Sequence, residues 1–197
     1  MKRGKLIVFE SISGTGKETQ AKLLQEFLNS KKIKSKIVYH PSPELKKILK
    51  SWHKTRKINH ITEVYLLLAD RHDWVRQLII PALEQGEWVI SLRSFVSAVV
   101  YQGQTATERK WIIKEFRHFE PKADKLFYFD IKPKIALQRI FQRHNNTGEA
   151  IGKFETLERL SEKRLAYLRV LKNIPHQKID SSQSIELVHQ QIIKHIK

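Results

Sequence analysis

The chain of 197 residues contains no cysteine, and no apolar run in it approaches the roughly 18 uncharged residues that a membrane span requires. The missing thiols exclude disulfide bonds and thiolate zinc sites, and they fit a reducing cytoplasm. The apolar run before Glu10 is only four residues long, so the N-terminal segment predicts a first strand rather than a signal peptide. We therefore expect a cytoplasmic protein without a membrane partner.

Acidic residues are scarce, with 20 Asp and Glu against 37 Lys and Arg, and the formal net charge is +17. Residues 1–60 carry 15 basic and 4 acidic groups, and residues 131–197 carry 13 and 6, so the excess lies in the two ends. A positive field attracts nucleotides, nucleic acid and anionic membranes alike. A lysine-rich solvated surface is the ordinary alternative.

Glycine and proline are also few, at 7 and 6 residues, and no Pro/Gly-rich linker divides the chain. We therefore expect one domain over residues 1–197. Apolar runs predict five buried strands, at Leu6–Phe9, Lys36–Tyr39, Trp88–Ser91, Lys125–Asp130 and Gln177–Asp180. Helical patterns occupy the segments Thr19–Asn29, Ile61–Leu83, Glu108–Phe119, Lys134–Arg143, Phe154–Leu171 and Ile185–Ile196. This alternation predicts a three-layer α/β/α fold whose parallel sheet binds ligands at the carboxyl ends of its strands.

The first strand runs into a candidate phosphate-binding loop, and residues 6–20 read LIVFESISGTGKETQ. Gly14 and Gly16 allow a tight turn of inward-pointing N–H groups, and Lys17 would meet the β- and γ-phosphates. The full pattern is G-x-x-x-x-G-K-[ST], and it is broken at Ser11 and at Glu18. The residues predicted to bind ATP here are Ser13, Gly14, Thr15, Gly16, Lys17, Glu18 and Thr19.

Two later segments carry arginines that suit phosphate chemistry. Arg71 follows Ala69 and Asp70 on a helix, and Arg93 follows a strand end, although an arginine taken singly is more often a surface ion-pair partner. Arg139 and Arg143 share a helical face before the glycine-containing stretch that ends at Gly152. This arrangement predicts a short lid at about residues 143–153, with an ordinary exposed loop as the alternative.

Taken together, these blocks resemble the thymidylate kinase family over nearly the whole chain. The matches in the first block are Phe9, Glu10, Gly14, Gly16, Lys17, Thr19 and Gln20, and Ala69, Asp70 and Arg71 follow. The middle block matches at Pro81, Ala82, Leu83, Gly86, Trp88, Val89, Arg93, Ser97, Tyr101, Gln102 and Gly103. Later matches are Pro121, Asp130, Pro133, Ala136, Arg139 and Glu155.

The resemblance implies a P-loop NTPase-type fold with a five-stranded parallel sheet and a short lid. It implies a homodimer that uses ATP and Mg²⁺ to phosphorylate dTMP or a related deoxynucleoside monophosphate. The catalytic residues implied are Lys17, Arg93 and Arg143, and Arg139 joins the ATP site. Those implied for the acceptor are Glu10, Leu67, Arg71, Ser97, Tyr101 and Gln102. Arg93 would contact the transferring phosphate and Arg71 the thymine edge.

The departures from the family pattern fall on the chemistry. Glu18 replaces the hydroxyl that holds Mg²⁺, and a carboxylate there could ligate the metal itself. Leu92 replaces an aspartate, Ser13 an acidic residue and Leu67 a phenylalanine that stacks on thymine. A catalytically impaired module that binds nucleotide or nucleic acid is therefore the alternative. A kinase for another acceptor is a third hypothesis, since the pair at Arg93 and Ser94 is similar to that of deoxynucleoside kinases.

Overall fold

A computed structural model describes residues 3–152 and 154–196. Its centre is a parallel five-stranded sheet of β1 (Leu6–Ser11), β2 (Ser35–Tyr39), β3 (Trp88–Leu92), β4 (Lys125–Asp130) and β5 (Gln177–Asp180). The strand order is β2-β3-β1-β4-β5, with β1 in the middle. All five predicted strands are present, and β1 and β4 consist almost entirely of buried residues. The predicted parallel α/β sheet is confirmed.

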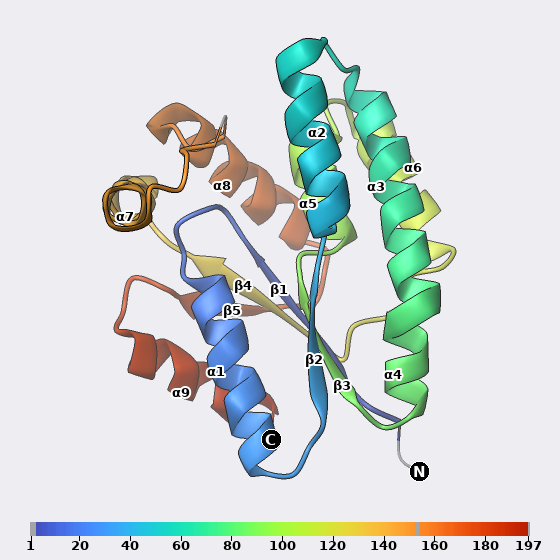
Figure 1. Cartoon of the computed structure of the whole chain (residues 1–197), viewed down its shortest axis with the longest axis vertical. Coiled ribbons are helices and arrows are strands. Elements are labelled where there is room, and N and C mark those ends of the chain that lie inside the picture. The colour runs from blue at the N-terminus through green and yellow to red at the C-terminus, as the bar shows by residue number, and fades with distance from the viewer. Residues whose placement is uncertain (1–2, 153, 197) are drawn as a thin grey trace.

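Helices cover both faces of the sheet (Figure 1). One face packs against α1 (Lys17–Ser30) and α9 (Ile185–Ile196), through Leu24 of α1 and Ile192 of α9 among others. The other face packs against α5 (Phe95–Gln102), α7 (Pro133–Thr147) and α8 (Leu157–Leu171). Alternate residues of each strand serve the two clusters, because successive strand side chains point to opposite faces.

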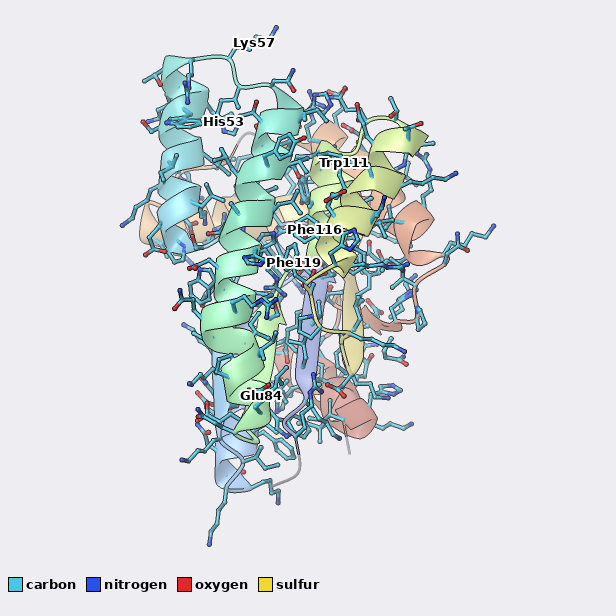
Figure 2. The ribbon with its side chains drawn as sticks, turned by 90° about the vertical axis from the view of Figure 1, so that its right-hand side faces the viewer. His53, Lys57, Glu84, Trp111, Phe116 and Phe119 are labelled. Atoms are coloured by element: carbon cyan, nitrogen blue, oxygen red, sulfur yellow. The ribbon has the colours of Figure 1, made fainter. Side chains whose placement is uncertain are left out.

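A third cluster lies beyond the sheet, between α2 (Pro43–Thr55), α3 (His60–Trp74), α5 and α6 (Ala106–Arg117). Figure 2 looks onto the face that α2, α3 and α6 build, with Trp111 and Phe116 on α6. Neither α2 nor α5 is predicted by the sequence patterns. Most of α2 is polar, with four lysines, and Leu45 is its one buried residue, so the apolar stripe of the helix is narrow.

The segment Ile61–Leu83 is predicted as one helix, and the structure divides it. After α3 comes the wider π-helical turn η1 (Val75–Ile79), followed by α4 (Ile80–Glu84). Pro81 lies in the first turn of α4 and has no N–H to donate to the preceding turn. A local change of hydrogen-bonding register ahead of the proline is the expected consequence.

Candidate active site at the carboxyl edge of the sheet

The loop between β1 and α1 has the backbone of an anion cradle. Gly14 and Gly16 lie in the left-handed region, with φ of 80° and 81°. Gly16 is the N-cap of α1 and offers no side-chain cap, so the first N–H groups of the helix stay available. A helix start of this kind favours a phosphate through both its N–H groups and its dipole.

The two glycines serve different purposes. A Cβ on Gly14 would lie 2.5 Å from the carbonyl oxygen of Ala136 on α7, so the loop backbone packs tightly against that helix. A Cβ on Gly16 would meet nothing within 4 Å, so the cradle is open on that side. Gly14 therefore anchors the loop, while Gly16 leaves room for a ligand.

Ser11, which stands where the loop pattern has its first glycine, is accommodated without strain. It is the last residue of β1, and positive φ values outside glycine occur, among the described residues, at Lys32 and Arg93 and not at this position. Its buried Oγ accepts a hydrogen bond of 2.9 Å from Thr15 Oγ1 and ties the two ends of the loop together. The serine thus replaces glycine's conformational freedom with a hydrogen bond.

Lys17 sits at the base of the cradle with its side chain largely buried. Burial lowers the pKa of its ammonium to about 7, and the nearby positive charge of Arg93 acts in the same direction. The negative charges of Glu18 and Glu10 oppose this effect only in part. Because burial is the main cause of the lowered pKa, an incoming anion would stabilise the charged form of Lys17.

Arg93 follows β3 and points across the end of β1. Its backbone adopts φ of 80°, a strained conformation for a residue with a side chain. Its N–H bonds to Phe9 O at 3.0 Å, and its Nη1 donates to Ser11 O, Ser97 Oγ and Tyr167 Oη at 3.3, 3.0 and 3.0 Å. Backbone strain of this kind persists where the surroundings hold it, and it is common in active sites.

Glu10 is fully buried beside Arg93 and accepts four hydrogen bonds. The donors are Ser94 N and Oγ, both at 2.7 Å, Ser97 Oγ at 2.6 Å and Tyr167 Oη at 3.0 Å. Burial raises the pKa of the Glu10 carboxyl, and these hydrogen bonds and the positive charge of Arg93 act against that rise. Because Glu10 is enclosed by the protein's own donors, its role here is to organise them.

Three residues implied for the acceptor face the interior instead. Arg71 is completely buried, and its guanidinium pairs with Glu120 and donates to Ser91 Oγ at 3.0 Å. Gln102 donates to Glu63 Oε2 at 3.0 Å, and Leu67 packs in the cluster beneath α3. A nucleoside would reach these groups only after this part of the site opens.

Tyr101 lies beside the charged groups. Its ring centroid is 5.2 Å from the guanidinium carbon of Arg93 and 5.1 Å from the ring of Phe154, which precedes α8. Arg93 thus contacts both Tyr101 and Ser97 of α5. The sequence brings these three together because α5 starts directly after β3.

A family model described as "Thymidylate kinase" matches residues 9–192. A "Probable thymidylate kinase" of Pyrococcus horikoshii is 33% identical over 204 residues, which span 99% of this chain and 97% of the relative. A "Thymidylate kinase" of Akkermansia muciniphila is 34% identical over 170 residues, spanning 86% and 80%, and one of Pseudoalteromonas translucida is 34% identical over 203 residues, spanning 95% and 93%.

The chain belongs to the thymidylate kinase family. Its sheet and its phosphate-binding loop are those expected of the P-loop fold of this family. Among the described residues, no helix combines the length and the apolar character that a bilayer crossing requires.

The segment predicted to form a lid falls between α7 and α8. The predicted lid begins at about residue 143, but α7 continues to Thr147 and ends at Gly148, whose φ is 69°. Residue 153 lies outside the described residues. Arg143 pairs with Glu149 and Glu155 at 3.1 and 3.2 Å, and Arg139 donates to the carbonyl oxygens of Ser181 and Ser182. Both arginines are thus bound to groups of the protein itself.

The family implies a magnesium ion, and one residue of this chain fits it. Glu18 lies in the first turn of α1 with 65% of its side chain exposed, and its Oε1 is 3.9 Å from Lys17 Nζ. A carboxylate oxygen suits Mg²⁺, which takes one or two protein ligands and completes its shell with phosphates and water. Leu92 is buried in the core and offers no ligand. No cluster of three or more His, Cys, Asp or Glu suited to a metal occurs within residues 3–152 and 154–196.

Sequence reasoning missed four residues that shape the site. Tyr167, Ser94, Ser91 and Glu120 hold Arg93, Glu10 and Arg71 in place. Tyr167 and Glu120 lie 74 and 49 residues from their arginine partners, so no local pattern indicates either contact. The strand position of Ser91, between apolar neighbours at the end of β3, is the one available signal of a buried polar role.

Gly14→Ala should destabilise the protein by about 2–5 kcal/mol, because it adds left-handed strain and a clash with α7. Gly148→Ala is the matched control, since its φ is also positive but a Cβ there meets nothing within 4 Å. It should cost only about 1–2 kcal/mol. Urea unfolding measures both, and equal losses would show that the contact with Ala136 carries no weight.

Binding of ATP should take up a proton at pH 8. The free Lys17, with its pKa near 7, is largely neutral at that pH and charged at pH 6, and bound phosphates would restore its charge. Calorimetric titrations in two buffers of different ionisation enthalpy measure the uptake. Lys17→Arg is the control and should abolish it, because arginine stays charged throughout. A binding enthalpy independent of the buffer for the unmodified chain would contradict this expectation.

Proposed function

We propose that the protein transfers the γ-phosphoryl group of ATP to dTMP and releases dTDP and ADP. The observation that carries this proposal is the convergence of Lys17 and Arg93 on the open side of a glycine cradle, in a chain of the thymidylate kinase family. Phosphoryl transfer depends mainly on positioning and charge neutralisation, and this edge of the sheet supplies both.

In the proposed reaction, a phosphate oxygen of dTMP attacks the γ-phosphorus while its bond to the bridging oxygen of ADP breaks. Lys17 and the N–H groups of the loop hold the phosphates of ATP, and Arg93 faces the group in transfer. Arg143 would join them by leaving Glu149 and Glu155 when the lid closes, and Arg139 would approach the ATP side.

On the acceptor side, Tyr101 and Ser97 are the groups nearest to Arg93, and Glu10 fixes Ser97. Arg71, Gln102 and Leu67 would form the base pocket. The first two must then exchange their bonds with Glu120 and Glu63 for bonds to the base, so acceptor binding includes a local rearrangement. Leu67 would contribute apolar contact in place of aromatic stacking.

Magnesium would be held by Glu18 together with the nucleotide phosphates, and the bound ion neutralises charge on the β- and γ-oxygens. The homodimer and the cytoplasmic location remain predictions from the family resemblance and the composition. The impaired module that binds nucleotide or nucleic acid has no observation that favours it over the kinase. A protein without kinase activity would support the impaired module instead.

The purified protein should produce ADP from ATP and Mg²⁺ in the presence of dTMP, and Lys17→Ala should reduce the rate by at least about 100-fold, because it removes charge stabilisation of the transferring group. The other deoxynucleoside monophosphates serve as the acceptor panel. A protein that shows no turnover above the Lys17→Ala level with any acceptor is not a nucleoside monophosphate kinase.

Glu18→Ala should raise the Mg²⁺ concentration for half-maximal rate by about 10-fold, since it removes one oxygen ligand. Glu18→Thr should restore part of the loss, because its hydroxyl can ligate the ion. The concentration dependence is measured at fixed, saturating ATP. An unchanged Mg²⁺ dependence in Glu18→Ala would remove Glu18 from the metal site.

A further inference from the structure

Helix α8 contributes a buried tyrosine to the group of residues around Arg93. Tyr167 is fully buried, and its hydroxyl lies 3.0 Å from Arg93 Nη1, 3.0 Å from Glu10 Oε2 and 2.7 Å from Ser97 Oγ. The three partners belong to the ends of β1 and β3 and to α5, which lies beside α8. The sequence patterns assign no role to Tyr167.

The hydroxyl groups of Tyr167 and Ser97 stand between a positive and a negative charge. Each accepts a hydrogen bond from Arg93 Nη1, and each lies within donating distance of Glu10 Oε2. The described residues include no direct hydrogen bond between Arg93 and Glu10. The carboxylate therefore orients the guanidinium through the two hydroxyl groups and not through a direct hydrogen bond, and Nη1 is the nitrogen that these contacts hold.

The backbone of Arg93 is held from the opposite side. Ser91 Oγ donates to Arg93 O at 2.8 Å and accepts from Arg71 Nη1 at 3.0 Å, and Arg71 in turn is ion-paired with Glu120. A residue with φ of 80° keeps that conformation only when its neighbours enforce it. The side chain and the backbone of Arg93 are thus fixed by two separate sets of buried contacts.

We propose that Tyr167 is a positioning residue, whose hydroxyl together with that of Ser97 aims Arg93 at the transferring phosphate and couples α8, the helix that follows the lid, to catalysis. This inference rests on the proposed function, because it assigns Tyr167 to the same reaction. Burial and the neighbouring Glu10 raise the pKa of Tyr167 well above its usual value, so its hydroxyl keeps its proton at any working pH.

The test is Tyr167→Phe, which removes the hydroxyl and keeps the ring. Tyr128→Phe is the matched control, because Tyr128 is equally buried in the same cluster and stacks on Tyr167 with centroids 5.4 Å apart. Its hydroxyl lies 3.5 Å from Asp130 Oδ1 and not beside Arg93. Tyr167→Phe should lower kcat by about 10-fold or more, with little change in the affinity for ATP, while Tyr128→Phe keeps kcat.

A double-variant cycle separates positioning from general stability. In an Arg93→Ala background, adding Tyr167→Phe should cause no further loss of kcat, because the hydroxyl acts through the arginine. A Tyr167→Phe protein that keeps kcat within twofold of the unmodified chain would overturn the proposal. The proposal would also be overturned if Tyr167→Phe lowered kcat by the same factor in the unmodified chain and in Arg93→Ala.

The guanidinium signals of Arg93 in nuclear magnetic resonance spectra provide a readout that needs no turnover. A fixed guanidinium gives separate signals for its two Nη nitrogens, and Arg93→Lys identifies them by their absence. Tyr167→Phe should merge or shift these signals, and Tyr128→Phe should leave them in place. If the unmodified chain lacks kinase activity, the proposed function fails, and this spectrum still decides the inference. Unchanged Arg93 signals in Tyr167→Phe would overturn it.

Discussion

Parallel pairing of β1 with β3 sets the position of every charged group in the site. The register places Phe9 opposite Leu92, so the residues that follow them, Glu10 and Arg93, lie at the same edge of the sheet. From this one constraint follow the phosphate-binding loop after β1, the start of α5 after β3 and the buried network between them. A slip of one residue would send these side chains to the opposite faces and dismantle the site.

The network separates its charges instead of cancelling them. Burial and the positive charge of Arg93 lower the pKa of Lys17, and two hydroxyl groups stand between Arg93 and the carboxylate of Glu10. In a buried ion pair, such as that of Arg71 and Glu120, the two charges neutralise each other without a ligand. Within the described part of the chain, Lys17 and Arg93 are instead joined to no carboxylate by a buried ion pair of this kind, so a bound phosphate could interact with both.

Sequence patterns predicted the central strands β1, β3 and β4 well because they are almost entirely buried and read as apolar runs. They failed at α2, whose surface is rich in lysine, and at the π-helical turn, which depends on the backbone ahead of Pro81. The loop residues and Arg93 could be assigned because they lie at fixed distances from strand ends. The enclosure of Arg71 and the contact of Tyr167 could not, since both depend on partners brought together only by the fold.

The proposed reaction requires that one line of phosphates passes between Lys17 and Arg93, with ATP at one end and the acceptor at the other. The most direct measurement is a calorimetric titration with a bisubstrate ligand, in which adenosine and thymidine are joined by five phosphates. We predict binding of one ligand per chain, weakened at least about 10-fold by Arg93→Ala and by Lys17→Ala separately. Absence of binding, or an affinity unchanged in both variants, would contradict a phosphate path between these two residues.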